Sequence, residues 1–377
     1  SGQFLTTLAR IRMFLLLFVL ALSGCNWQDG ANQFLPVVYL GWDENEMNQL
    51  YVYRPNREPQ QISDVANGVH DFTLGPDGQS IVYTTMVTGG TSQLWMTTAD
   101  GNENRLLLTC QGAACAYPVW AADGRRLIYE RRPVDENGGS GSAQLWWLDT
   151  ETGETELVLA GEGAGGTGAR FSPDGRWLSY VSPQEEGVII YNLVDGNSHF
   201  VADEIGVPAA WSLDSEHVIV PNLDLVIIHG DEGDDHLEHT HDYQTATHLF
   251  KFDLANNELQ NLSGDRPVED SVPAWSPDGE WIAFGRRFPG TAAGRQLWLM
   301  KSNGSEQQPL ADDPTITHGP PVWSPDGRHL LFQRFVNGDG DDYPSIWVLD
   351  LESGQSEELT TKGMQPVWLA AQTGKME

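Results

Sequence analysis

Histidines and carboxylates gather in one segment of this chain. Five of the ten histidines lie between positions 229 and 248, in a run dense in Asp and Glu. In extended backbone, His239 and His241 face the same side, and imidazoles beside carboxylates can bind zinc or another transition metal. The candidate ligands are His236, His239, His241 and Asp242. The alternative is a solvated acidic loop that binds nothing specific.

A second group of oxygen ligands suggests calcium. Asn337, Asp339 and Asp341 alternate along the chain, as at the start of a calcium-binding loop. Asp342 stands where an EF-hand requires glycine, and Val348 stands where it requires glutamate. The segment is therefore not an EF-hand, and it predicts either a looser calcium site or an ordinary turn.

Two cysteines lie close together in the sequence. Cys110 and Cys115 fall in one polar stretch, and nearby cysteines pair in an oxidising compartment. A pair of metal-binding thiolates is the alternative, but it lacks a second cysteine pair and a nearby histidine. We expect a disulfide that rigidifies a loop.

The elements that must position these groups come from a repeated phrase. An aromatic residue followed by Ser-Pro-Asp-Gly and an alternating apolar stretch starts at Phe171, Trp275 and Trp323, with weaker copies at Leu74, Trp120 and Trp211. Pro, Asp and Gly favour a tight turn, and the alternation that follows predicts a strand. The copies recur at intervals of 40 to 64 residues. A strand-rich repeat of about this length indicates a β-propeller with one blade per repeat.

The ends of the chain predict how the ring closes. Pro366, Val367 and Trp368 match the start of a blade, but no Pro-Asp-Gly turn follows them. The apolar stretches after position 36 supply the strands that this blade lacks. We therefore expect an all-β propeller of seven four-stranded blades, the last one shared by the two ends, which hides two sheet edges. Six blades would result if the N-terminal strands packed elsewhere.

The repeat resembles a known family. Its Trp-Ser-Pro-Asp-Gly core and the Leu-Trp strand that follows, as at Leu297 and Trp298, are similar to the TolB-type repeat, also called the WD40-like or PD40 repeat. The resemblance spans about residues 35–371 and implies the propeller fold. Proteins with this repeat include periplasmic binding components and the propeller domains of serine peptidases, so it implies no single function. The sequence has no match to the extra N-terminal domain of TolB, and we expect a TolB-like protein rather than TolB.

The N-terminus indicates export. Arg10 and Arg12 precede a short apolar run that ends in Leu-Ser-Gly before Cys25. The run is too short to span a bilayer, and the pattern is typical of a secretory signal. The ending resembles a bacterial lipoprotein signal, which implies that Cys25 carries the lipid; an ordinary signal peptide is the alternative. We expect a signal in residues 1–24, a tether in 25–34, one propeller in 35–371 and a tail in 372–377.

The charge narrows the partners. The chain has 53 acidic and 21 basic residues, a net charge of −32. Such a charge argues against nucleic acid and anionic lipid as partners, and it suits solubility, cations or a basic partner. The remaining membrane contact would be the lipid anchor, and we expect a monomer.

One face of the predicted propeller carries the long insertions. They fall in the connections between second and third strands and between successive blades, which share a face, and function concentrates in loops on a rigid scaffold. Alignment on the repeat places five residues where the inner strands begin, at the channel mouth: His70, Asp71, Asp270, Ser271 and His318. Such residues could converge on a ligand or carry out acid–base chemistry.

These observations favour a binding protein. We expect a non-catalytic lipoprotein on the outer side of a bacterial membrane, in the periplasm or at the cell surface. It would engage an envelope protein or extracellular polymer through the acidic, loop-rich face. The alternative is a metal-dependent carbohydrate-active enzyme, a lyase or glycosidase, with its site at the mouth. No cofactor is required by the first hypothesis, whereas calcium or zinc would serve the second.

Overall fold

The computed structural model describes residues 34–87, 89–135, 139–159, 165–228, 242–311, 313–336 and 343–370. The chain divides into two units, 1–34 and 35–377, and the fold described below belongs to the second. Its described residues form 29 β-strands. Among them there is no helix with the length and hydrophobicity needed to cross a bilayer.

The first three blades follow one another along the chain. Blade 1 contains β4 (Asp71–Leu74), β5 (Ser80–Met86), β6 (Ser92–Thr98) and β7 (Asn104–Cys110). Blade 2 contains β8 (Ala113–Trp120), β9 (Arg126–Pro133), β10 (Gln144–Asp149) and β11 (Thr155–Leu157). Blade 3 contains β12 (Thr167–Phe171), β13 (Trp177–Ser182), β14 (Gly187–Asn192) and β15 (Ser198–Ala202).

The next three blades repeat the pattern, with two long strands in blade 4 and a divided inner strand in blade 6. Blade 4 contains β16 (Ala210–Trp211), β17 (His217–Ile228), β18 (Asp242–Asp253) and β19 (Glu258–Asn261). Blade 5 contains β20 (Glu269–Trp275), β21 (Trp281–Arg287), β22 (Gln296–Lys301) and β23 (Gln308–Pro309). Blade 6 contains β24 (Ile316–His318), β25 (Val322–Trp323), β26 (His329–Val336), β27 (Ser345–Asp350) and β28 (Ser356–Thr360).

The two ends of the described chain share the closing blade. It contains β29 (Met364–Trp368), β1 (Val37–Trp42), β2 (Asn48–Tyr53) and β3 (Gln60–Gln61). The C-terminal strand β29 pairs antiparallel with β1, as expected from the unmatched Pro-Val-Trp. Blades 4 and 5 are also joined by one parallel bridge, between Thr247 and Glu269.

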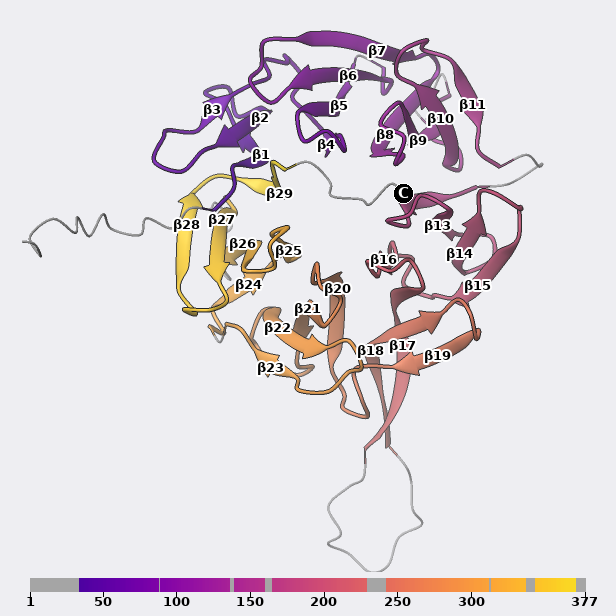
Figure 1. Ribbon diagram of the computed structural model, residues 1–377, viewed down its shortest axis with the longest axis vertical. Coiled ribbons are helices and arrows are strands. Elements are labelled where there is room, and N and C mark those ends of the chain that lie inside the picture. The colour runs from indigo at the N-terminus through magenta and orange to yellow at the C-terminus, as the bar shows by residue number, and fades with distance from the viewer. Residues whose placement is uncertain are drawn as a thin grey trace, which may run out of the picture. The chain divides into compact units, whose positions relative to one another are not determined.

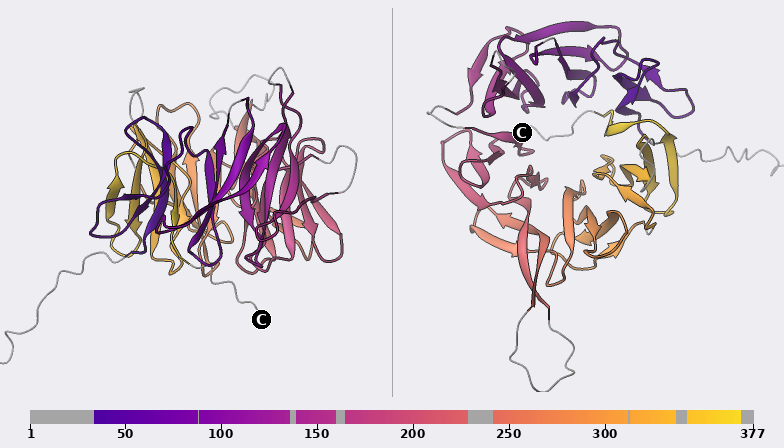
Figure 2. Two further views of the ribbon diagram at one scale, coloured as in Figure 1. Left: turned by 90° about the horizontal axis from the view of Figure 1, so that it is seen from above. Right: turned by 180° about the vertical axis from the view of Figure 1, so that it is seen from behind.

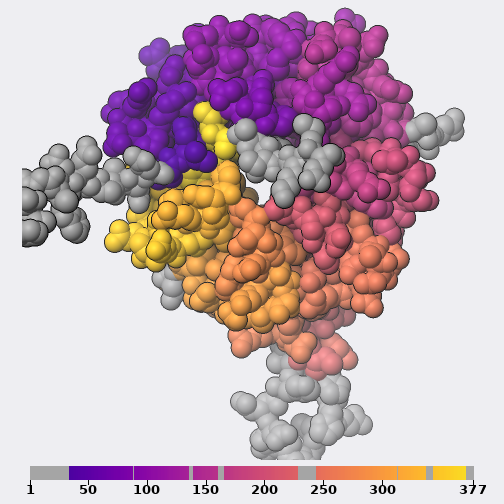
Figure 3. Space-filling view, viewed as in Figure 1, coloured from indigo at the N-terminus to yellow at the C-terminus, as the bar shows by residue number. Residues whose placement is uncertain are grey.

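The expected β-propeller with four-stranded blades is confirmed. The strand pairing within the described residues gives six sheets, of which the eight-stranded one consists of blades 4 and 5 joined by their parallel bridge. In blade 6 the inner strand is divided into β24 and β25, which both pair with β26. The resulting seven blades stand around a common centre (Figures 1 and 2). The space-filling view shows a hollow near that centre (Figure 3). In blade 4, the paired strands β17 and β18 extend beyond the ring as a two-stranded arm (Figure 1).

The hydrophobic core lies between the blades. One cluster joins Val82 and Leu94 of blade 1 to Leu127 and Tyr129 of blade 2, and comparable clusters fill five other interfaces of the described ring. Second strands are therefore covered on both faces, as in β5, where five consecutive residues are buried. Because apolar burial dominates folding free energy, each blade is stabilised mainly by its two neighbours.

The Ser-Pro-Asp-Gly phrase forms the turn that the sequence predicts. The Ser172 hydroxyl donates to the Asp174 carboxylate over 2.5 Å and accepts from the Trp177 amide over 2.9 Å. Gly175 has φ of 70°, a conformation that glycine adopts without steric cost. Equivalent bonds recur at Ser212, Ser276 and Ser324, so the turn is one structural device used repeatedly.

The tryptophans of the repeat link successive blades. The Trp275 indole donates to the Ala210 carbonyl of the preceding blade, over 3.3 Å. Trp323 bonds Ala274 in the same way, over 3.0 Å. In the described structure, however, the buried Trp120 indole nitrogen at this repeat position has no hydrogen-bond partner. These tryptophans pack against the hydrophobic clusters between successive blades.

This difference gives a stability test. Trp323→Phe removes the indole donor and leaves the Ala274 carbonyl without it, whereas Trp120→Phe removes a donor that bonds nothing. We expect Trp323→Phe to lower the free energy of unfolding by about 1 kcal/mol more than Trp120→Phe. Urea denaturation followed by fluorescence measures both variants. Equal losses would show that ring packing alone matters.

Candidate functional site

A cavity of about 1170 Å³ is bounded by blades 3 to 6. Its wall includes the start of β20, the end of β21 and the segments 205–209 and 291–295. These segments belong to the two classes of connection that carry the long insertions. The cavity therefore lies on the loop-rich side of the ring, where the sequence places the channel mouth.

Elsewhere in the ring, polar side chains close the corresponding space. At three interfaces, a side-chain carboxylate or side-chain amide oxygen of one blade accepts a hydrogen bond from a backbone N–H of the next blade. The donating residue lies in the inner strand and has a positive φ angle. These bonds run from Tyr117 to Asp71 over 2.9 Å, from Gly168 to Glu130 over 2.7 Å, and from Gln365 to Gln333 over 3.1 Å. Buried donors are thus satisfied, and neighbouring blades are held together at the mouth.

The blades around the cavity have different residues at the matching position. Glu130 and Gln333 lie in the second strand of their blades, each paired with an apolar residue of the third strand. The same position in blades 3, 4 and 5 is occupied by Val181, Pro221 and Gly285. None of the three can extend a polar group toward the next blade. The cavity therefore opens where the repeat loses its polar bridges.

The carboxylates of the cavity wall are already paired. Glu269 lies 2.5 Å from the Arg287 guanidinium, with both side chains partly exposed. Asp270 is fully buried, and its two oxygens accept from the Arg286 Nε and Nη2 atoms, each over 2.6 Å. The bidentate geometry neutralises Asp270, and Glu269 is ion-paired through its Oε2 atom, so each carboxylate already has a cationic partner.

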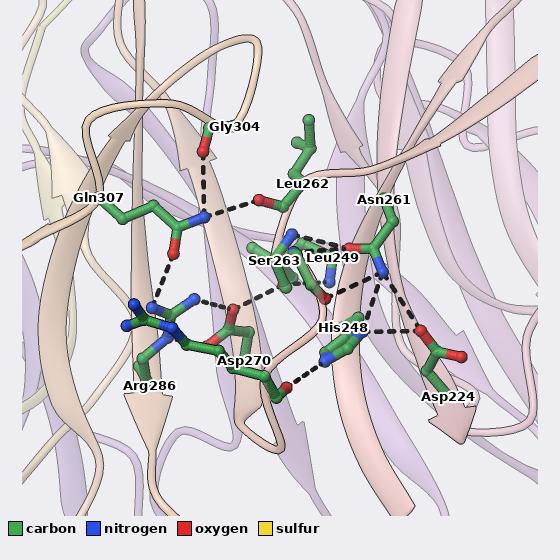
Figure 4. Close-up of polar contacts among 12 residues, drawn as sticks. Asp224, His248, Leu249, Asn261, Leu262, Ser263, Asp270, Arg286, Gly304 and Gln307 are labelled. Atoms are coloured by element: carbon green, nitrogen blue, oxygen red, sulfur yellow. Dashed lines mark hydrogen bonds and ion pairs between the residues drawn. The ribbon is translucent and has the colours of Figure 1, made fainter. Parts of the chain in front are cut away.

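A buried polar network surrounds the Asp270–Arg286 pair (Figure 4). The Ser263 hydroxyl donates to Asp270 over 2.6 Å, and Arg286 donates to the Gln307 side chain over 2.8 Å. The network joins blade 5 to blade 4, because Ser263 also accepts from the Leu249 amide of β18. Its complete bonding indicates a rigid support behind the cavity.

The same close-up includes a fully buried histidine (Figure 4). His248 Nδ1 lies 2.8 Å from an Asp224 oxygen, and Nε2 lies 2.8 Å from the Arg266 carbonyl oxygen. Asn261 bonds both Asp224 and His248. Every polar atom of the ring is occupied, so His248 supports the base of the β17–β18 arm.

Two arginines of the cavity make no ion pair with any residue that the structure describes. Arg170 bonds only the neighbouring Ala169 carbonyl, and it keeps solvent contact although protein surrounds it closely. That surrounding protein lowers the pKa of Arg170, while the Glu130 charge raises it. Desolvation, followed by the charge of Arg287, lowers the pKa of Arg295. Both remain cations at neutral pH, because an arginine side chain stays protonated far above neutrality.

The five predicted mouth residues separate into two groups. Asp270 and Ser271 line the cavity, and the buried Ser271 hydroxyl has no hydrogen-bond partner among described residues. His70, Asp71 and His318 do not line it. The structure therefore brings together only the blade 5 members of this set.

The three remaining mouth residues have structural contacts. Asp71 is buried between Thr84 and the Tyr117 amide, and burial raises its pKa. His70 is half exposed and lies 4.0 Å from Asp71. His318 Nδ1 lies 3.3 Å from the Arg295 carbonyl oxygen, and burial lowers the pKa of its imidazole.

The predicted metal ligands are not placed. His236, His239, His241, Asn337, Asp339 and Asp341 lie outside the described residues, and only the backbone of Asp242 is described. Cys25, the predicted lipid attachment point, also lies outside them.

Within the described residues, Asp214, Glu216 and His217 come close enough together to hold a metal ion. They lie at a Ser-x-Asp turn, on the opposite side of the ring from the cavity. His329 contacts Asp326 and Asp350 as His217 contacts Asp214 and Asp253. The arrangement therefore belongs to the repeat.

The predicted disulfide is confirmed. Cys110 and Cys115 are bonded, at a Cα–Cα distance of 6.2 Å. The bond lies where β7 ends and β8 begins, between blades 1 and 2. Both cysteines are buried, so the bond stabilises the connection between two blades.

Sequence reasoning missed both unpaired arginines. Arg170 precedes the repeat aromatic, where the other repeats have Thr73, Val119, Ala210 and equally uncharged residues. A column of the internal alignment could thus have identified it. Arg295 has no such signal, because the space that it fills depends on Gly285 of the adjacent strand.

No family model matches the chain. A 224-residue stretch is 27% identical to an uncharacterised protein of Agrobacterium fabrum, covering 58% of this chain and 70% of that one. Another, of 192 residues, is 27% identical to the uncharacterised peptidase YuxL of Bacillus subtilis. It covers 44% of this chain but 28% of the peptidase.

Solved structures share the fold at low sequence identity. The β-propeller domain of the trilobed protease from Pyrococcus furiosus has a TM-score of 0.58 at 14% identity, covering 86% of this chain and 91% of that one. TolB from Acinetobacter baumannii has a TM-score of 0.50 at 13% identity, and the match covers 89% of this chain and 66% of TolB. Oligogalacturonate lyase from Vibrio parahaemolyticus has a TM-score of 0.50 at 17% identity, and the match covers 80% of this chain and 75% of the lyase. These similarities establish the β-propeller fold, which TolB shares, and leave the function open.

The buried network predicts a contrast between adjacent residues. Asp270→Asn leaves the buried Arg286 charge without its partner, and we expect a loss of about 3 kcal/mol in the free energy of unfolding. Glu269→Gln breaks an exposed pair and should cost less than about 1 kcal/mol. Thermal and urea unfolding of both variants measure the difference. Equal, small losses would mean that Asp270 is not needed to support the cavity.

Proposed function

We propose that this chain is a non-catalytic extracytoplasmic binding protein whose ligand site is the cavity between blades 3 and 6. The proposal rests on which charged side chains of the cavity wall are ion-paired and which are not. Its carboxylates are neutralised by Arg286 and Arg287, whereas Arg170 and Arg295 remain without an ion pair among described residues. Such a wall can hold a ligand, but it offers no poised acid or base.

The enzyme alternative finds less support at the same place. A metal-dependent lyase or glycosidase needs imidazoles or available carboxylates around its reacting atoms. Among the described residues of the cavity wall there is no histidine, and both carboxylates are paired. The fold is shared with proteins described as TolB, as peptidases and as a lyase, so it favours neither hypothesis by itself.

The place of action follows from the N-terminal pattern and the disulfide. A disulfide suits an oxidising compartment outside the cytoplasm. We propose export through the lipoprotein signal, with Cys25 as the lipid anchor on the outer side of a bacterial membrane. The partner would be an envelope protein or extracellular polymer, and the net charge of −32 on the whole chain would favour a partner with basic regions.

Blocking the cavity tests this function. Ala292→Trp fills part of the cavity wall, whereas Ala255→Trp places the same side chain on an exposed turn at the opposite side of the ring. The full chain, crosslinked in envelope extract, should capture a defined partner that Ala255→Trp retains and Ala292→Trp loses by at least about tenfold. Quantitative mass spectrometry compares the three baits. Equal capture by both variants would contradict a ligand site in the cavity.

A further inference from the structure

We infer that the cavity binds the free carboxylate at the C-terminal end of an apolar peptide segment, held by Arg170 and Arg295. This inference rests on the proposed binding function and specifies its ligand. It is argued from the charge of the two arginines, the apolar wall and an exposed apolar strip that begins at the cavity.

The arginines place positive charge at the cavity of an acidic chain. The chain as a whole carries −32, yet Arg170, Arg287 and Arg295 line the cavity, and only Arg287 has an ion pair there among described residues, with Glu269. The charges of Glu130 and Glu269 also act on Arg170 and Arg295. Surrounding protein disfavours the charged form of both arginines, although Arg170 keeps solvent contact, and Arg287 repels Arg295. An entering anion would reduce both unfavourable terms, and guanidinium groups bind carboxylates with well-defined geometry.

The position of Arg295 depends on a glycine in the neighbouring strand. A Cβ atom at Gly285 would lie 2.2 Å from Arg295 Cδ and 2.8 Å from its Cγ. Because real atoms cannot approach so closely, the absence of a side chain at Gly285 lets Arg295 lie against β21. The matching positions of other blades carry Thr84, Glu130 and Gln333. The arginine and the glycine together form a local structure that differs from the rest of the repeat.

The rest of the wall favours an apolar body. Four prolines line the cavity, and each lacks a backbone N–H donor. They are accompanied by aliphatic side chains, among them Val207, Leu223 and Val272. A sugar polymer presents hydroxyl groups around each ring, whereas the apolar side chains of a peptide can bury carbon surface against this wall, and the peptide backbone would bond elsewhere. The wall therefore fits a carboxylate attached to an apolar segment.

An exposed apolar strip continues from the cavity. Leu223 lines the cavity, and strand alternation puts Leu225 and Ile227 on the same face of the arm. Tyr243 pairs with Ile227 and shares that face. Leu225 and Tyr243 are 67% and 62% exposed, which is unusual for residues of this size. The strip is about 13 Å long from Leu223 to Ile227, enough for four extended residues of a ligand.

A direct binding assay tests the inference. The probes are fluorescein-labelled apolar tetrapeptides that differ in their last residue, each made as a free acid and as a C-terminal amide. Fluorescence anisotropy with the purified full chain should show that free acids bind at least about tenfold more tightly than the matching amides. The double variant R170Q/R295Q should lose this preference.

Matched controls separate charge at the cavity from charge in general. The double variant R125Q/R328Q removes two arginines from exposed ion pairs at the turns on the opposite side of the ring, and it should bind like the native chain. Circular dichroism confirms that both double variants are folded. Leu225→Ser should weaken binding of the free acids by about tenfold without changing the preference for acid over amide.

Three results would overturn the inference. They are equal binding of acids and amides, no binding of any free acid, or arginine-dependent binding of an oligogalacturonate in place of the peptides. The last result would identify an acidic polysaccharide as the ligand. The proposed function is tested separately by partner capture with the variant baits. If Ala292→Trp no longer captures the partner but R170Q/R295Q still does, the cavity is a binding site and the carboxylate is not its ligand.

Discussion

Each blade of this ring depends on its neighbours, because its four-stranded sheet buries apolar side chains on both faces. A sheet of this size has little stability alone, so the inter-blade clusters supply most of the folding free energy. The tryptophan indoles then fix the distance between blades, with Trp275 bonding Ala210 and Trp323 bonding Ala274. The closing pair β29–β1 completes the circle and leaves no open end in the described ring.

The same dependence explains where the cavity lies. Between blades 1 and 2, blades 2 and 3, and blade 6 and the closing blade, polar side chains bond the next inner strand. In blades 3 to 5, Val181, Pro221 and Gly285 replace them, and the inner strands leave a space. Behind the wall, the buried Asp270–Arg286 network joins blade 5 to blade 4. A repeat protein thus acquires a binding site by local loss of its standard bridges.

Much of the fold could be predicted because its determinants are local in sequence. The Ser-Pro-Asp-Gly turn is specified by adjacent residues, and the unmatched Pro366-Val367-Trp368 indicated the closing strand. The site was less predictable, because the net charge of its wall depends on ion pairs between residues that are far apart in the sequence. Asp270 lines the cavity, but its neutralisation by Arg286 depends on how β20 and β21 align. Arg295 could not be recognised without the contact to Gly285.

The central claim is that Arg170 and Arg295 form an anion site within the cavity. The most direct measurement is a crystal structure of the protein soaked in sodium bromide, with bromide located by anomalous scattering. The account predicts bromide in hydrogen-bond contact with Arg170 or Arg295, and none at Arg286, whose charge Asp270 neutralises. Bromide at exposed arginines such as Arg328 but absent from the cavity would contradict it.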